Sequence, residues 1–204
     1  MRFFALLLAL LPAIPAAMAV EQPPYIVLRQ YPAFEIRRYE PQVVAEVTVQ
    51  GNAEDAGNAG FRILAGSIFG KNKGARTAPM TAPVTQTPQK IAMTAPVAMA
   101  SADPGAHTVR FVMPRGWRLD TLPEPEDRRI ELREEPARAW AVIRYSGLWS
   151  EKRYREHLGK LREAMAAASV AGRGEPVWAR YDPPWTPWFM RRNEVWIETD
   201  TTPH

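Results

Sequence analysis

The order of apolar and polar residues changes its period several times along the chain, and each period indicates a different element. Downstream of Pro24, apolar residues alternate with polar or charged neighbours at Phe34, Ile36, Val43, Ala45, Val47 and Val49. Alternation with period two is typical of β-strands that bury one face. The pattern therefore predicts two antiparallel strands joined at Glu40-Pro41.

The spacing of apolar residues then changes to three and four. Between Ala53 and Phe69 the small or apolar residues include Ala56, Gly60, Ile63, Leu64 and Ile68. This spacing predicts an amphipathic helix that ends near Gly70. The glycines at positions 57, 60 and 66 each lower helix propensity by about 1 kcal/mol relative to alanine. We interpret them as places of close packing.

The pentapeptide MTAPV then occurs twice, at 80–84 and at 93–97. Its β-branched Thr and Val favour an extended chain, and its Pro suits a strand edge or a bulge. The repeat predicts two neighbouring strands of a hairpin, linked by residues 85–90, with pocket lining as a secondary possibility. A further strand is expected at 107–114.

The second half of the chain repeats this order of elements. Residues 150–169 form an expected helix, whose apolar stripe contains Tyr154, Leu158, Leu161, Met165 and Ala168. Strands are expected on both sides of it, at 128–136, 137–147, 176–182 and 191–199. The order strand-strand-helix-strand-strand therefore occurs twice. It predicts an α+β fold in which each helix covers its own half of an antiparallel sheet.

The first 19 residues do not fit this plan. They contain one Arg, an apolar run from Phe3 to Leu11 and small residues up to Ala19, as a signal peptide does. The run is about half of the roughly 20 residues that a membrane-spanning helix needs. We expect cleavage after Ala19 and a periplasmic or secreted mature chain, residues 20–204. An uncleaved anchor is the alternative.

The composition of the chain excludes several classes of function. Of 204 residues, 46% are hydrophobic and 24% charged, which describes a folded domain with a real core. The net charge of +4 is scattered, without the basic and aromatic stripe of a nucleic-acid-binding surface. The absence of Cys excludes disulfides, thiolate catalysis, Cys-ligated zinc and covalent c-type haem.

The sequence contains no motif that nominates an enzyme. A nucleophile elbow, a zinc-protease helix, a phosphate loop and a dinucleotide fingerprint are all missing. The three histidines, His107, His157 and His204, are too far apart to indicate a metal site by spacing. We expect no catalytic residue and no metal site, with His157 at the boundary of its helix stripe.

Two groups of residues retain alternative interpretations. Four methionines are expected mainly to fill the core, with Cu(I) bound by Met80 and Met93 as the weaker idea; they are Met80, Met93, Met99 and Met113. The Pro-rich segment 181–190 crowds Trp185, Trp188 and Phe189 into a loop. These aromatics either close over a flat apolar ligand, with Arg191 or Arg192 near its acidic groups, or cap the sheet end.

Ordered landmarks over the mature chain resemble the SOUL haem-binding protein family. They are Phe34-Glu35-Ile36-Arg37 followed by Tyr39, GFRILAGSIFGKN at 60–72, the doubled MTAPV, FVMP at 111–114 and YDPPWTPWFMRRNEVW at 181–196. The resemblance implies a single domain over 20–204. Its implied fold is a distorted, barrel-like antiparallel sheet with two helices in a pseudo-twofold arrangement.

The same resemblance implies non-covalent binding of haem or a related tetrapyrrole in an apolar groove, as a carrier or buffer and without catalysis. The groove of the family lies between the first helix and the loop before the last strand, which here gives Asn58, Phe61, Ala65, Trp185, Thr186 and Trp188. Asn58 and Thr186 are neutral where a positive charge would help to hold propionates. Arg38 occupies the place of a His ligand found in one branch, so His ligation is excluded there.

Other classes of function stay open beside this one. The chain is alternatively an enzyme that acts on tetrapyrroles, or an envelope protein that binds another apolar small molecule, a lipid or a protein partner. Conversion of bound haem favours the enzyme. Recovery of one stoichiometric protein partner favours the envelope protein.

Overall fold

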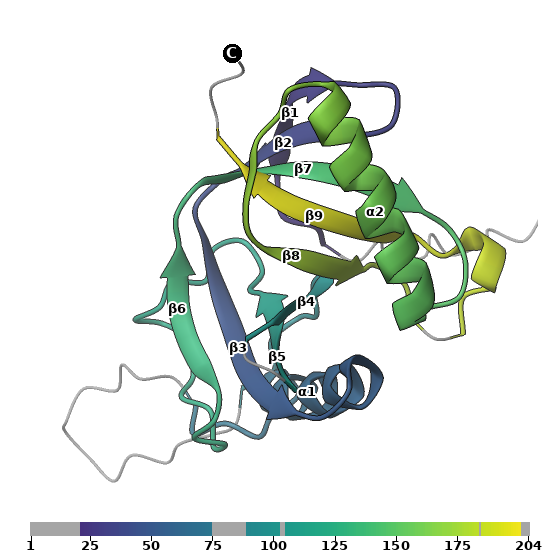
Figure 1. Cartoon of the computed structure of the whole chain (residues 1–204). Coiled ribbons are helices and arrows are strands. Elements are labelled where there is room, and N and C mark those ends of the chain that lie inside the picture. Colours follow the sequence, from purple (N-terminus) through teal and green to yellow (C-terminus); the bar gives the residue numbers. More distant parts are fainter. Residues whose placement is uncertain (1–20, 75–88, 103–104, 184, 201–204) are drawn as a thin grey trace, which may run out of the picture.

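The computed structural model describes residues 21–74, 89–102, 105–183 and 185–200. The predicted signal peptide and the first MTAPV, with Met80, lie outside the described residues. The described residues form two α-helices, a short 3₁₀ helix and nine strands of one antiparallel sheet (Figure 1). Within them, no helix is both long enough and apolar enough to cross a membrane.

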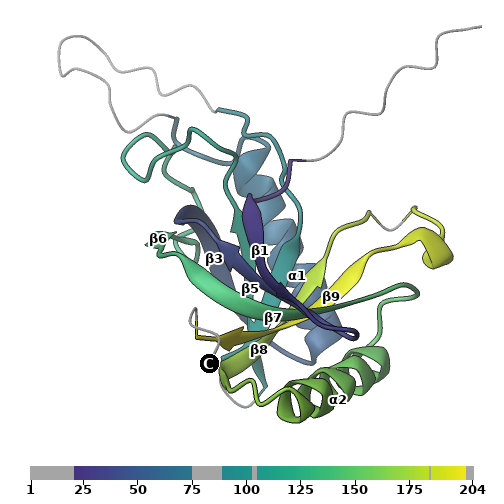
Figure 2. The ribbon, with the colours of Figure 1, turned by 90° about the horizontal axis from the view of Figure 1, so that it is seen from above.

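The sheet combines strands from both halves of the chain in the order β1-β2-β7-β9-β8-β4-β5-β3-β6. The strands are β1 Tyr25–Gln30, β2 Glu35–Tyr39, β3 Gln42–Gln50, β4 Val97–Ser101, β5 Ala106–Val112, β6 Glu131–Glu135, β7 Arg138–Tyr145, β8 Gly172–Arg180 and β9 Asn193–Thr199. The helices are α1 Ala53–Ile68, α2 Glu151–Ala167 and the 3₁₀ helix η1 Trp188–Met190. Figure 2 shows the strong curl of the sheet.

Each α-helix begins at a capping side chain. Asn52 accepts hydrogen bonds from the backbone N–H groups of Glu54 and Asp55, at 3.1 and 3.0 Å, and Ser150 accepts one from Arg153. These oxygens satisfy backbone donors that have no partner inside the helix. The acidic residues in the first turn of α1 also suit the positive end of the helix dipole.

The helices pack on the sheet through separate apolar clusters. α1 lies on β3 and β5, where Leu64 and Val109 are fully buried, and α2 lies mainly on β7 and β9 around Leu161. Trp178 links the two clusters, because it belongs to the α1 core and stacks on Tyr154 of α2 with ring centroids 4.4 Å apart. A third cluster with Tyr39, Trp140 and Trp196 occupies the opposite face of the sheet.

Within the described residues both predicted helices and most of the predicted strands are confirmed, but one predicted pairing is wrong. After β1, the chain runs strand-strand-helix-strand-strand twice. However, β2 and β3 do not form a hairpin at Glu40-Pro41: β2 pairs with β1 and β7, whereas β3 pairs with β5 and β6. Alternation reports which face of a strand is buried and carries no information about its partner. The pseudo-twofold arrangement stays a prediction.

The second MTAPV forms only the start of a strand. Thr94 makes an isolated bridge to Glu21, and β4 begins at Val97, the last residue of the repeat. β4 pairs with β5 and β8, so those two strands flank it. The predicted hairpin partner at 80–84 lies outside the described residues, and that pairing stays a prediction.

Gly60 lets α1 approach the sheet closely, and we expect Gly60→Ala to destabilise the fold. A Cβ at position 60 would lie 2.5 Å from Cγ2 of Val109, which is fully buried. Overpacking of this kind costs about 2 kcal/mol, so Tm should fall by about 4–8 °C. Thermal unfolding followed by circular dichroism measures the change.

Gly159 in α2 is the matched control, because a Cβ there meets no atom within 4 Å. Gly159→Ala should raise stability by about 0.5–1 kcal/mol through helix propensity alone. Equal effects of the two substitutions would contradict close packing at Gly60.

Candidate functional site

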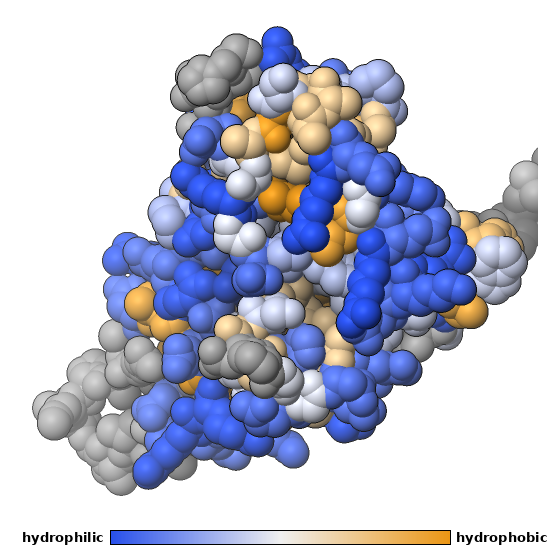
Figure 3. All heavy atoms as spheres, viewed as in Figure 1, coloured by the Kyte–Doolittle hydropathy of each residue, from blue (hydrophilic) through white to orange (hydrophobic). Residues whose placement is uncertain are grey.

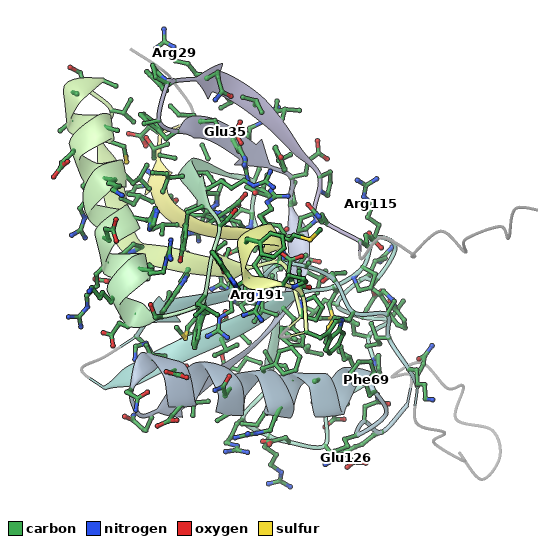
Figure 4. The ribbon with its side chains drawn as sticks, turned by 90° about the vertical axis from the view of Figure 1, so that its right-hand side faces the viewer. Arg29, Glu35, Phe69, Arg115, Glu126 and Arg191 are labelled. Carbon is green, nitrogen blue, oxygen red and sulfur yellow. The ribbon has the colours of Figure 1, made fainter. Side chains whose placement is uncertain are left out.

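The loop between β8 and β9, residues 181–192, projects from the end of the sheet and carries the predicted tryptophans (Figures 1 and 2). Figure 4 looks onto this side of the molecule, with α1 along the bottom, α2 on the left and Arg191 of the loop in the middle. The groove that the family resemblance implies would lie between this loop and α1.

Both ends of the loop are fixed at its base by one buried carboxylate, Glu194 of β9. Its side chain is fully buried, and it accepts hydrogen bonds from Tyr181 Oη and Arg192 Nε, both at 2.8 Å. The Arg192 guanidinium also lies 3.8 Å from the centre of the Tyr181 ring. The loop therefore leaves and rejoins the sheet at a rigid, charged clamp.

The clamp continues across the sheet. Arg37 of β2, only 3% exposed, lies 2.9 Å from Glu194, and Trp196 donates its indole N–H to the same carboxylate at 2.8 Å. Burial alone would raise the pKa of Glu194, but the charges of Arg37 and Arg192 outweigh burial and hold the pKa below its ordinary value. Glu194 is thus an ionised, fully partnered group.

The base of the loop is buried, whereas the apolar side chains at its tip face solvent. The exposed fractions are 82% for Trp185, 58% for Trp188, 61% for Phe189 and 64% for Met190. Figure 3 shows orange surface at this edge of the molecule, on the right. Soluble proteins seldom expose a contiguous apolar patch without a function.

The tip is ordered by its own contacts. Arg191 donates from Nε to the backbone carbonyl of Thr186 at 2.7 Å, and the rings of Trp188 and Phe189 meet edge to face at 5.7 Å. Thr186 is half-buried and its backbone N–H donates to Pro183. Its predicted role in binding stays a prediction.

On the α1 side, the three predicted residues differ in exposure. Phe61 is 38% exposed and packs edge to face on Phe111 of β5, with ring centroids 5.5 Å apart. Asn58 faces solvent. Ala65 is only 8% exposed and belongs to the α1 core, so it offers a ligand little surface.

α1 approaches the start of the loop 181–192 at Arg180, which is the last residue of β8. Its Nη2 lies 3.2 Å from the position that a Cβ on Gly57 would occupy, and Gly57 is one helical turn before Phe61. Across the sheet, Val97 pairs with both Arg180 and Phe111. No ring contact in the described part of the chain joins Phe61 to Trp185 or Trp188, and these three residues do not line either of the two hollows of ligand size described below.

Arg180 and Trp149 are not marked by any sequence motif, yet both belong to this region. The Arg180 guanidinium lies over the Trp149 ring, which in turn stacks on Trp178 at 4.7 Å. The alternation of β8 could have placed Arg180 from the sequence. Arg180 is two residues after the buried Trp178, so both side chains lie on the same, helix-covered face. A charge at such a position is unusual.

Two hollows of ligand size lie elsewhere. One, about 570 Å³, is lined by Trp117, Met113 and several prolines and glutamates near Pro23. The other, about 560 Å³, lies between α1 and residues 126–130. It touches Ala59 and Ile63, which at 100° per residue lie on the other flank of α1 from Phe61. Both hollows are alternative places for a ligand.

Met93, Met99, Met113 and His157 take part in packing. Met99 and Met113 are each 7% exposed in the α1 core, and Met93 packs against it. His157 stacks on Tyr145 at 4.0 Å, and its Nδ1 lies 2.7 Å from the Arg153 carbonyl oxygen, as expected of a boundary residue. The described residues contain no group of three or more His, Asp or Glu side chains placed to hold a metal ion.

Comparison with known proteins supports the family and the fold. A family model described as SOUL heme-binding protein matches residues 20–90 and 85–198. No curated protein matches the chain significantly.

Two solved structures illustrate the fold. The C-terminal domain of EcmrR has a TM-score of 0.57 and 10% identity, over 83% of this chain and 98% of that one. A hydrolase from Listeria innocua has a TM-score of 0.51 and 10% identity, over 89% and 93%. At this identity the likeness shows a shared fold alone.

Proposed function

Because the chain belongs to the SOUL heme-binding protein family, we propose that it binds haem or a related tetrapyrrole, without covalent attachment, between α1 and the loop 181–192. The exposed apolar tip of the loop carries this proposal. Trp185, Trp188 and Phe189 are each more than half exposed, although their loop is tied to the sheet at a buried ionic clamp. Rigid, exposed aromatic rings suit the flat face of a macrocycle.

The two walls of the proposed groove, α1 and the loop 181–192, each contribute to binding. Phe61 offers a partly exposed ring from α1, while the tryptophans of the loop face solvent on the other side. Removing apolar area from water contributes about 25 cal/mol per Å², so the two faces of a macrocycle supply affinity without a bond to iron. The protein then acts as a carrier or buffer of its ligand, and no residue is assigned to catalysis.

We expect that iron contributes little to binding. His157 is engaged with Tyr145 and Arg153, and Arg38 stands at the strand position of the His ligand proposed for one branch of the family. In absorbance and tryptophan-fluorescence titrations of the mature chain, haem and iron-free protoporphyrin should therefore bind with affinities within about threefold of each other. Binding of the iron form alone would overturn this mode. Conversion of bound haem during incubation would favour the enzyme class instead.

We also propose that the protein works outside the cytoplasm, in the periplasm or after secretion. The support is the signal-peptide pattern of residues 1–19, which lie outside the described residues. N-terminal sequencing of the exported protein tests this proposal: a chain that begins at Val20 supports it, and a cell fraction containing only uncleaved cytoplasmic protein contradicts it.

A further inference from the structure

The hollow beside Trp117 is of ligand size and lies apart from the proposed groove. Its volume of about 570 Å³ is within the range of small-molecule sites, about 300–1,000 Å³. Its walls are the segment before β1, the β2–β3 turn, Thr94 of the second MTAPV, residues 112–117 and Glu134 of β6. None of the residues assigned to the groove lines it. The hollow is therefore a second candidate site.

The walls of this hollow are held by hydrogen bonds of their own. The backbone N–H of Met113 donates to the carbonyl of Val43 at 2.8 Å, which joins the chain after β5 to β3. The carbonyl of Glu21 accepts from the backbone N–H of Ala95, and its carboxylate accepts from that of Arg115, both at 2.9 Å. The shape of the hollow is thus formed without a ligand.

The charge of this lining is opposite in sign to that of the whole chain. The chain carries a net charge of +4, but the charged residues of the hollow are three glutamates and one arginine, namely Glu21, Glu40, Glu134 and Arg115. Arg115 lies 4.0 Å from Glu21, and its side chain is 69% exposed and extends into solvent (Figure 4). The side chains of Glu40 and Glu134 have no ion pair within the described residues. Two carboxylates at the hollow are therefore available to a cation.

The uncharged polar groups of the lining also favour a hydrogen-bond donor. Oε1 of Gln42 is buried and has no donor within the described residues, although Nε2 of the same amide donates to Glu135 at 3.2 Å. Buried polar groups are nearly always hydrogen-bonded. The lining also contains four prolines, which are Pro23, Pro24, Pro41 and Pro114. Because proline has no backbone N–H, these positions offer only carbonyl oxygens to a ligand.

Trp117 and Met113 give the same hollow an apolar side. Met113 is 7% exposed, and Trp117 is half-buried and packs against the α1 core. The face of an indole ring attracts a cation and packs well on a flat apolar body. A tetrapyrrole with free carboxylates suits this lining poorly, because its charges would meet those of Glu40 and Glu134. The lining suits a ligand that combines a positive charge with an apolar body.

We propose that the hollow beside Trp117 binds a small organic cation with N–H donors on an aromatic body, of the aryl amidinium or aryl ammonium class. This site is independent of the proposed tetrapyrrole groove. Glu40 and Glu134 balance the charge of the ligand, Gln42 accepts one of its hydrogen bonds, and Trp117 contacts its aromatic body. Hydrogen bonds between a charged donor and a carboxylate are among the strongest in proteins, so the charge of the ligand decides its affinity.

The test compares 4-aminobenzamidine, which is a cation, with 4-aminobenzamide, a neutral molecule of nearly the same shape. In ¹H–¹⁵N NMR titrations the wild-type mature chain should bind the amidine at least about 10-fold more tightly than the amide. The indole N–H signal of Trp117, assigned with Trp117→Phe, should shift. The signal of Trp178, whose indole N–H donates to Tyr145 at 3.0 Å in the α1 core, should not. Equal affinity for the two molecules, or a shift at Trp178 alone, would overturn the proposal.

Removing the two free carboxylates tests the same site from the protein side. Glu40→Gln/Glu134→Gln should weaken binding of the amidine by about 10- to 100-fold and leave binding of the amide unchanged. Glu131→Gln/Glu163→Gln is the matched control, because it removes two charges at exposed positions outside the hollow, and it should bind as the wild type does. Equal losses in the two variants would contradict a site at the hollow. Iron-free protoporphyrin should bind both variants alike, so failure of the tetrapyrrole groove is measured separately.

Discussion

Glu194→Gln should lower the free energy of unfolding by about 3 kcal/mol, because it removes the fully buried partner of Arg37 and leaves that buried charge with only the partly exposed Glu35. Arg37 is 3% exposed and Glu194 is fully buried, so water cannot replace the lost interaction. For a chain of this size the change lowers Tm by about 6–12 °C. Thermal and urea unfolding measure it.

The pH dependence of stability should change in the same variant. The pKa of Glu194 lies below its ordinary value of 4.5, and a carboxyl with a depressed folded-state pKa contributes stability above its unfolded pKa and loses it as the pH falls. The wild type should therefore lose stability on acidification below about pH 4.5, and the variant should lose less over that range.

Glu198 provides the matched control, because it lies on the same strand and face as Glu194. It pairs with Arg138 and Arg173 at 2.8 and 2.9 Å, but Arg173 is 59% exposed. Glu198→Gln should cost about 1 kcal/mol or less, since water screens such pairs. A loss as large as that of Glu194→Gln would show that burial is not the cause.

Removing one ring from each wall should abolish most of the binding. In Phe61→Ala/Trp185→Ala, the loss of two large contact areas should weaken affinity for iron-free porphyrin by about 100- to 1000-fold. Trp185 is 82% exposed, so its removal should cost the fold little, whereas Phe61 is 38% exposed and packs on Phe111, so thermal unfolding of Phe61→Ala must show that the variant is still folded. Fluorescence titration of the variant and of each single substitution measures the effect.

The control replaces apolar residues of similar exposure outside the groove. Ile26 and Val27 of β1 are each 48% exposed, and Ile26→Ala/Val27→Ala should bind as the wild type does. If the Phe61/Trp185 variant also binds normally, the macrocycle lies elsewhere, and the hollow beside Trp117 or the other flank of α1 becomes the better location.

The sequence predicted the elements of the fold better than their partners. The alternation at Val43 to Val49 and the three-four spacing from Ala53 report burial directly, and both elements form where expected. The pairing of β2 with β7 depends on contacts more than 90 residues apart in the chain, and no local pattern specifies it. The predicted hairpin at Glu40-Pro41 failed for that reason.

The same limit applies to the candidate site. The Pro-rich loop singled out its aromatic residues without deciding whether they face a ligand or cap the sheet end, and a helix pattern was enough to place Phe61 on α1. Neither pattern predicted that the Arg180 guanidinium would lie over the Trp149 ring, because Trp149 comes from the β7–α2 connection. Ala65 illustrates the reverse, since a small residue on the expected face packs into the core.

A crystal structure of the mature chain with iron-free protoporphyrin tests the central claim most directly. The proposal predicts the macrocycle between Phe61 and the tryptophans of the loop 181–192. A macrocycle bound in the hollow beside Trp117, or against Ile63 on the other flank of α1, would contradict it.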